Sequence, residues 1–159
     1  MMPLHKKIIS LLLFIILAFG ASAWGGLITS FYKEPWYSTI IKPEFNPPDW
    51  IFGPVWTTLY ILMGISVWLV WKREPSADRT IGIRIFWVQL FFNILWTYIF
   101  FGIQKIGLSF FEIIFLIFLI FSNVIYFLKI DKIAGYLLIP YLIWVLYASV
   151  LTYNIWILN

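Results

Sequence analysis

The chain has 159 residues, of which 63% are hydrophobic and only 11% charged, and its formal net charge is +4. Because a soluble domain of this length needs a charged surface, the composition excludes an ordinary soluble protein and indicates one membrane-embedded domain over residues 1–159. Cysteine is absent and His5 is the single histidine, so we expect no metal site and no cofactor, and the lack of a basic patch with stacking rings argues against a nucleic-acid partner.

Five apolar segments are long enough to cross a bilayer, since about 20 residues rising about 1.5 Å each span the hydrocarbon core. Backbone groups in lipid must be paired within the segment, so we expect these segments to be helices. The prediction is an all-α membrane protein, a bundle of five transmembrane helices. Their expected ranges are 8–28, 51–71, 85–103, 108–128 and 133–158.

The first segment has two interpretations. Lys6 and Lys7, the apolar run and the small residues 21–23 together resemble a cleavable signal peptide. The run continues past that cleavage point through Trp24 to Ile28, which favours a retained helix.

Small residues also recur every fourth position on this helix, at Ala18, Ser22 and Gly26. Such a ladder lets another helix approach closely, either inside the bundle or across a homodimer. The sequence does not choose between the two.

The loop over residues 29–50 is rich in proline, which restricts the backbone, and in large aromatic residues. Pro43, Pro47 and Pro48 stiffen it. Large amphipathic side chains are added by Trp36, Tyr37, Phe45 and Trp50. One interpretation is an interfacial aromatic belt. The other is a semi-rigid lid over the mouth of a pocket, which the density of prolines favours.

Three of the expected helices carry a face of aromatic and amide side chains at helical spacing. Amides are costly against lipid, so Gln89 and Asn93 must point into the bundle, where they either bridge helices or line a pocket. The combined faces would enclose an aromatic cavity suited to a flat apolar macrocycle, with Pro140 bending the last helix. The three faces are Trp56, Tyr60, Met63, Val67; Gln89, Asn93, Trp96, Phe100; and Pro140, Trp144, Ala148, Leu151.

Glu112 is the one ionisable residue well inside an apolar run. An acid there is a functional candidate. It also lies near the start of its helix, where we expect it to reach the interface and play a structural role.

The loops indicate an orientation. Eight basic residues share the side of the N-terminus, and three lie opposite, at Lys33, Lys42 and Lys105. The positive-inside rule therefore predicts a cytoplasmic N-terminus and an external C-terminus. The eight are Lys6, Lys7, Lys72, Arg73, Arg79, Arg84, Lys129 and Lys132.

Several motifs occur in a fixed order: Trp36-Tyr37, Lys42-Pro43, Asn46–Thr57, the spaced Gln89, Asn93 and Trp96, and Pro140–Trp144. With these motifs the chain resembles the tryptophan-rich sensory protein / translocator protein family (TspO/MBR, peripheral-type benzodiazepine receptor), bacterial type. The resemblance implies a five-helix bundle in the bacterial cell membrane, with one pocket open towards the first loop, and often a homodimer. It implies that porphyrins and other hydrophobic ligands bind there.

The ligand-binding residues expected from these faces and motifs are Trp36, Tyr37, Pro47, Trp50, Trp56, Tyr60, Gln89, Asn93, Trp96, Trp144 and Ala148. Animal members carry a cholesterol motif ending in a cation, whereas here Leu151 and Tyr153 are followed by no basic residue, which puts sterol binding in doubt.

The leading functional hypothesis is a membrane receptor or carrier for porphyrin-type tetrapyrroles. The resemblance also admits an enzyme-like degradation of porphyrin in light and oxygen, with Trp56 and Trp144 as catalytic candidates. A stress-signalling interaction protein is the third hypothesis. No acid–base or nucleophilic constellation for conventional catalysis is evident.

Overall fold

The computed structural model describes residues 3–159, and the regular elements in that range are all helices. Five helical spans are long and apolar enough to cross a membrane, which confirms the predicted bundle of five transmembrane helices. A short helix, α2 (Trp36–Thr39), lies in the first loop. The spans are α1 (Leu4–Tyr32), α3 (Asp49–Trp71), α4 (Ala77–Thr97) with its π-helical turn η1 (Tyr98–Gly102), α5 (Ile106–Ile130), and α6 (Lys132–Leu137) with α7 (Ile139–Leu158).

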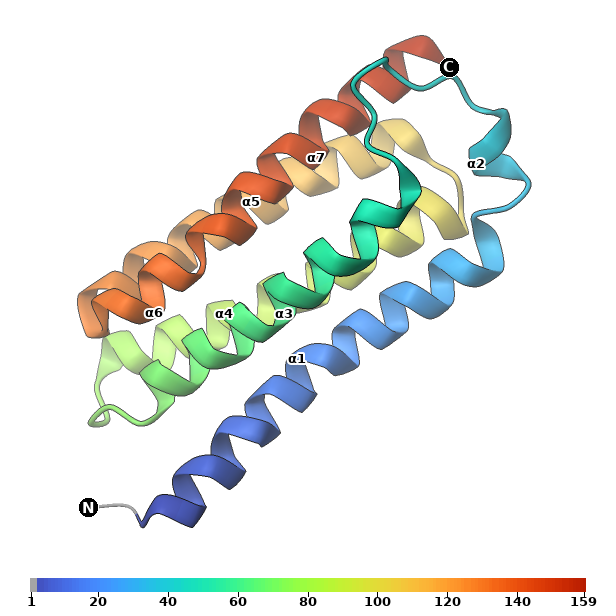
Figure 1. Ribbon diagram of the computed structural model, residues 1–159. Coiled ribbons are helices and arrows are strands. Elements are labelled where there is room, and N and C mark those ends of the chain that lie inside the picture. Colours follow the sequence, from blue (N-terminus) through green and yellow to red (C-terminus); the bar gives the residue numbers. More distant parts are fainter. Residues whose placement is uncertain (1–2) are drawn as a thin grey trace.

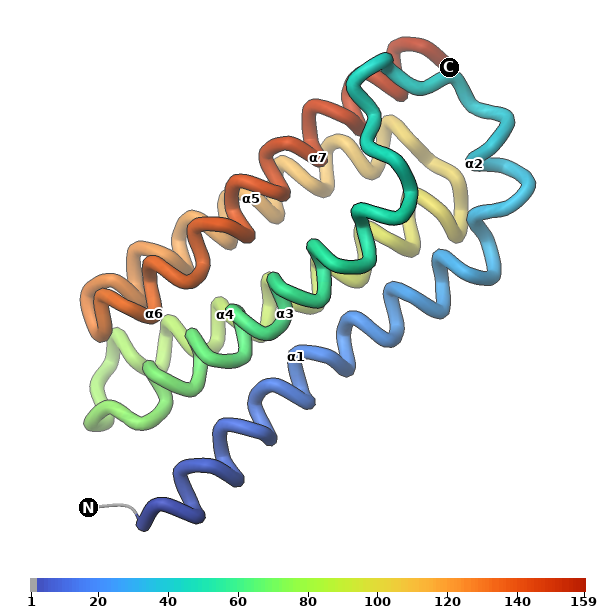
Figure 2. The backbone as a smooth tube through the Cα atoms, in the orientation of Figure 1, coloured from blue at the N-terminus to red at the C-terminus, as the bar shows by residue number. Residues whose placement is uncertain are grey.

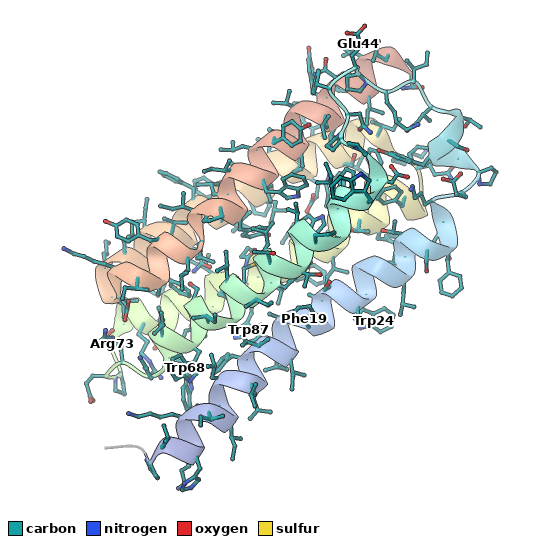
Figure 3. All side chains as sticks on the ribbon, in the orientation of Figure 1. Phe19, Trp24, Glu44, Trp68, Arg73 and Trp87 are labelled. Carbon is teal, nitrogen blue, oxygen red and sulfur yellow. The ribbon has the colours of Figure 1, made fainter. Side chains whose placement is uncertain are left out.

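The spans run up and down in one elongated bundle, and the two ends of the chain lie at opposite ends of it (Figures 1 and 2). Glu44, in the first loop, and Arg73, between α3 and α4, mark these two ends (Figure 3). The first loop and the C-terminus therefore share one end of the molecule, which places them beside each other in space.

Helix ends differ from the expected ranges because a polar helix can continue beyond the apolar core. Helix α1 extends to Tyr32 and stops before Pro35, since a residue that precedes proline avoids helical geometry. Helix α4 begins at Ala77 rather than residue 85, where the Ser76 Oγ accepts a hydrogen bond of 3.1 Å from the Arg79 backbone N–H and caps the first turn.

The last membrane span covers Lys132–Leu158 and is interrupted at Leu138, close to Pro140, where the sequence predicts a bend. Helix α6 ends at Leu137, and Pro140 lies in the first turn of α7. Proline lacks an N–H and its ring clashes with the carbonyl four residues earlier, so the helical hydrogen bonding is interrupted there and resumes in α7. Pro140 is exposed on the outside of the bundle, away from the face where it was expected.

The interior is packed by large side chains from four spans, including Met63, Phe86, Phe127 and Tyr141, each almost fully buried. Large apolar side chains cover the outer surface, as a lipid-facing protein requires. Helix α1 is the most peripheral span, and Trp24 points outwards from it (Figure 3). Its closest approach is to α3, where the Cβ of an alanine at Gly64 would lie 2.7 Å from the Ile15 Cα.

Candidate functional site

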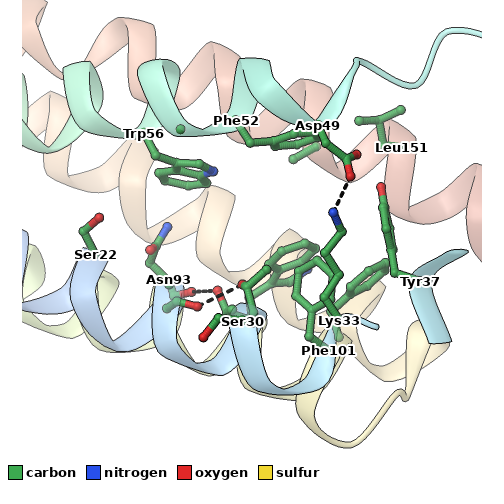
Figure 4. Close-up of a pocket in the computed structure, with 18 of the residues that line it drawn as sticks. Ser22, Ser30, Lys33, Tyr37, Asp49, Phe52, Trp56, Asn93, Phe101 and Leu151 are labelled. Carbon is green, nitrogen blue, oxygen red and sulfur yellow. Dashed lines mark hydrogen bonds and ion pairs between the residues drawn. The ribbon is translucent and has the colours of Figure 1, made fainter. Parts of the chain in front are cut away.

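A cavity of about 630 Å³ lies inside the bundle at the end that carries the first loop. Helices α1, α3, α4 and α7, the turn η1 and the first loop all contribute to its walls. Its volume falls in the range of roughly 300–1,000 Å³ that small-molecule pockets occupy. Trp56 projects into it from α3, towards the side from which Ser22 and Asn93 project (Figure 4).

Aromatic rings make up much of the cavity wall. Trp56 packs against Tyr60 at 5.6 Å between ring centroids, and Phe52 packs edge-on against Trp144 at 5.9 Å. On the opposite wall Trp96 stacks on Phe100 at 5.0 Å. These separations are typical of attractive aromatic pairs, so the rings fix one another in place and present their remaining faces to the cavity.

A chain of hydrogen bonds crosses the base of the cavity. The Tyr60 hydroxyl donates to the Asn93 Oδ1 at 2.6 Å, and the Asn93 Nδ2 donates to the Tyr141 hydroxyl oxygen at 3.1 Å. The Tyr141 hydroxyl in turn donates to the Gln89 Oε1 at 2.9 Å. All four side chains are buried, and their bonds join α3, α4 and α7. Buried hydrogen bonds of this kind hold helices together where no water competes, although within residues 3–159 the Gln89 Nε2 has no partner.

The loop end of the cavity is formed by Lys33, Glu34, Tyr37, Asn46 and Asp49. An ion pair between the Lys33 Nζ and the Asp49 carboxylate joins the end of α1 to the start of α3 across the cavity (Figure 4). Beside it, the Tyr37 hydroxyl donates to the Asn46 Oδ1 at 3.4 Å.

Tyr37 stays uncharged at neutral pH. Burial raises the pKa of its phenol above the ordinary value, the hydrogen bond to Asn46 lowers it, and the nearby Asp49 carboxylate raises it further. The net direction is upward. The Lys33 ammonium also lies 5.2 Å from the centroid of this ring.

The first loop is fixed to the end of α7. The Asn159 side chain accepts a hydrogen bond from the Ile41 N–H and donates one to the Ile41 carbonyl, both at 2.9 Å. The Tyr147 hydroxyl donates to the Phe45 carbonyl at 2.7 Å. These contacts hold the segment that carries Tyr37 and Asn46, which line the loop end of the cavity.

Seven of the eleven residues expected at a ligand site lie together around this cavity. Asn93, Trp56 and Trp144 come from three different spans and share one space, as the combined faces require. The seven are Tyr37, Trp56, Tyr60, Asn93, Trp96, Trp144 and Ala148.

Four expected residues lie outside the lining, for separate reasons. Trp50 is 74% exposed on the outer side of α3, and Trp36 packs against Phe100 at 5.4 Å behind the wall. The Pro47 carbonyl accepts a hydrogen bond from the Asn46 side chain. Gln89 is fully buried and bonded to Tyr141, so it bridges helices below the cavity.

Helix α1 supplies a wall that the sequence reasoning missed. Of the small residues Ala18, Ser22 and Gly26, Ala18 is fully buried in the core, whereas Ser22 and Gly26 line the cavity. An added Cβ at Gly26 would meet no atom within 4 Å. Small and polar residues on this helix leave the space open. The small and polar residues continue along the same side of α1 as far as Lys33. That pattern could have indicated a cavity wall. The lining residues of α1 and the adjoining loop are Ser22, Gly25, Gly26, Thr29, Ser30 and Lys33.

Glu112 lies in the second turn of α5, and its side chain turns into the bundle. Its side chain is buried on α5, and within residues 3–159 neither carboxylate oxygen has a hydrogen-bond partner. It is outside the cavity lining.

Comparison with known proteins agrees with this architecture. Residues 12–157 match the TspO/MBR family. The "Tryptophan-rich protein TspO" of Chlorobaculum tepidum is 36% identical over 98% of this chain and 99% of its own length. The protein of the same name from Archaeoglobus fulgidus is 35% identical over 99% of each chain. The human "Translocator protein" is 32% identical over 76% of this chain and 73% of its own length.

Proposed function

Since this chain belongs to the TspO/MBR family and is an integral membrane protein, we propose that it is a receptor or carrier that binds porphyrin-type tetrapyrroles and similar hydrophobic molecules in the cavity. The observation that carries the proposal is the convergence of Trp56, Trp96 and Trp144 on one cavity of about 630 Å³. Indole faces stack on a flat macrocycle, while a few polar groups such as Asn93 orient it.

The first loop acts in this proposal as a lid. Its residues Tyr37 and Asn46 line the cavity, and its contacts with Asn159 and Tyr147 hold it in place. We propose further that the first loop and the C-terminus face the exterior. Eight of the eleven basic residues lie on the side of the N-terminus, and the positive-inside rule places that side in the cytoplasm. A reporter fused after Asn159 should be active outside the cytoplasm, and a cytoplasmic reporter would reverse this orientation.

A titration of the purified protein with protoporphyrin IX in the dark tests the function. Tryptophan fluorescence should be quenched in a saturable manner, and Trp56→Ala and Trp144→Ala should each weaken binding about tenfold, because each removes one stacked ring. Trp24→Ala is the matched control, since Trp24 is 65% exposed on the outside of α1.

Equal affinities for the wild-type protein, Trp56→Ala and Trp144→Ala would rule out this cavity as the porphyrin site.

The same samples under illumination address the alternative of light- and oxygen-dependent degradation. Loss of porphyrin absorbance at the rate seen without protein would exclude it. A stress-signalling role would instead be supported by a partner protein that co-purifies in fixed stoichiometry.

A further inference from the structure

The charged side chains of the cavity wall are confined to one end. Lys33, Glu34 and Asp49 lie at the loop end, whereas the base carries the uncharged groups of Tyr60 and Asn93. A guest that fills this space meets rings and neutral hydrogen-bonding groups along most of its length, and charge only near the loop. The cavity therefore fits an amphiphile, with a flat apolar body and an ionised group at one edge.

From this arrangement we propose that Lys33 anchors a carboxylate of the bound ligand, which takes the place of Asp49 in the Lys33–Asp49 ion pair. The proposal rests on the proposed function, because it assigns a ligand class to the same cavity. It makes Lys33 a specificity-determining residue that selects anionic over neutral ligands of the same shape.

The two partners of the ion pair are not equally placed. The Lys33 side chain is 23% exposed and stays beside the Tyr37 ring, at 5.2 Å from its centroid. The Asp49 side chain is 59% exposed at the start of α3. Asp49 can return to water with little penalty when it is displaced, whereas an unpaired ammonium in the cavity wall needs a new partner.

Exchange of one carboxylate for another keeps Lys33 paired throughout binding. A neutral ligand has no group to offer in exchange, so the Lys33–Asp49 pair stays closed across the loop end of the cavity. Asp49 thus competes with the ligand carboxylate for the same ammonium. Removing Asp49 should strengthen the binding of an acid and leave the binding of its ester unchanged.

Protoporphyrin IX and its dimethyl ester form the matched pair of probes. In the full-length protein in detergent, we expect the acid to bind at least about threefold more tightly than the ester. Lys33→Gln should reduce the acid-to-ester affinity ratio to one by weakening the acid alone, and Lys33→Arg should restore it. Asp49→Asn should increase the ratio by about threefold or more.

Lys42→Gln is the charge-matched control. The Lys42 ammonium lies 4.6 Å from the centroid of the same Tyr37 ring but outside the cavity wall, so the ratio should not change. An acid preference that survives in Lys33→Gln, or equal binding of acid and ester to the wild-type protein, would overturn the anchor alone. Failure of both probes to bind the wild-type protein would overturn the proposed function, and the anchor with it.

Discussion

At the scale of single residues, Asp131 makes two separate contacts where α5 meets α6. Its Oδ1 accepts a hydrogen bond of 3.1 Å from the Ala134 N–H and so caps α6. Its Oδ2 accepts two hydrogen bonds from the Arg73 guanidinium, at 2.6 and 3.0 Å. Asp131 is 3% exposed and Arg73 is 54% exposed, so the guanidinium reaches from water to a buried carboxylate.

We predict that the two contacts can be separated by substitution. Asp131→Asn keeps a good capping side chain and loses only the ion pair, which is worth about 1 kcal/mol or less because Arg73 is half exposed. Asp131→Ala loses the cap as well and should destabilise the protein by about 1 kcal/mol more. Apparent melting temperatures in detergent measure both changes, and equal melting temperatures for the two variants would contradict the capping role.

The same residue predicts a pH dependence. Burial acts to raise the pKa of Asp131, but hydrogen bonds from Arg73 and Ala134 and the charge of Arg73 hold it below the ordinary value of 3.8. The associated stabilisation is therefore complete above that ordinary value and is lost as the pH falls through the lowered pKa. The difference in melting temperature between wild type and Asp131→Asn should shrink with acidification, and a constant difference would refute this.

Residue types predicted the inward direction of Gln89 and Asn93 but not their separate roles. Both amides had to leave the lipid face, because lipid offers them no partner. Whether an amide bridges helices or lines a cavity depends on which side chains fill the space next to it. Here Tyr141 of α7 forms hydrogen bonds with both amides. The sequence of α4 alone does not indicate that Tyr141 lies next to them.

At the scale of helices, α1 and α3 meet at Gly64. Its added Cβ would lie 2.7 Å from the Cα and 3.1 Å from the backbone N of Ile15. Because these are backbone atoms, a side chain there cannot be accommodated by a rotamer change, and the helices must separate.

We predict that Gly64→Ala destabilises the protein by about 1–3 kcal/mol, through overpacking of this contact. Gly20→Ala on α1 is the control, because its Cβ would meet nothing within 4 Å. Thermal unfolding of both variants in detergent gives the comparison. A melting temperature for Gly64→Ala that equals that of Gly20→Ala would show that α1 does not pack on α3 in this way.

The number of spans was predictable because lipid imposes length, apolarity and complete backbone pairing on every crossing segment. The polar start of α4 could not be predicted from hydropathy, because a cap such as Ser76 acts through local geometry. The exact place where the last span is interrupted could not be predicted either, because a proline near a helix start also acts locally. The α1 wall was missed for a related reason. A stripe of small residues looks the same whether it faces a helix or an empty space.

At the scale of the whole molecule, the C-terminus and the first loop meet at one end of the bundle. Asn159 is separated by 118 residues from Ile41, yet the two exchange hydrogen bonds. The figures show this contact as the meeting of the first loop and the end of α7 (Figures 1 and 2). The bundle therefore brings together at one end the parts that surround the cavity opening.

We predict that Asn159→Ala loosens the first loop. Two partly exposed hydrogen bonds are worth about 1 kcal/mol together, so backbone amides of residues 33–48 should exchange with solvent about fivefold faster, and a bound porphyrin should dissociate faster by a similar factor. Asn154→Ala is the control, because the Asn154 side chain donates a hydrogen bond to the Val150 carbonyl of its own helix rather than to the first loop. Unchanged exchange in Asn159→Ala would show that the loop is held by other contacts.

The hydrogen bonds that run from Tyr60 through Asn93 and Tyr141 to Gln89 also have a consequence for the depth of the cavity. Helices that slide past each other by a single residue move about 1.5 Å, which is enough to break bonds of this length. The base of the cavity is thus locked at one height along the bundle, so a change in the depth of the cavity has to come from its loop end.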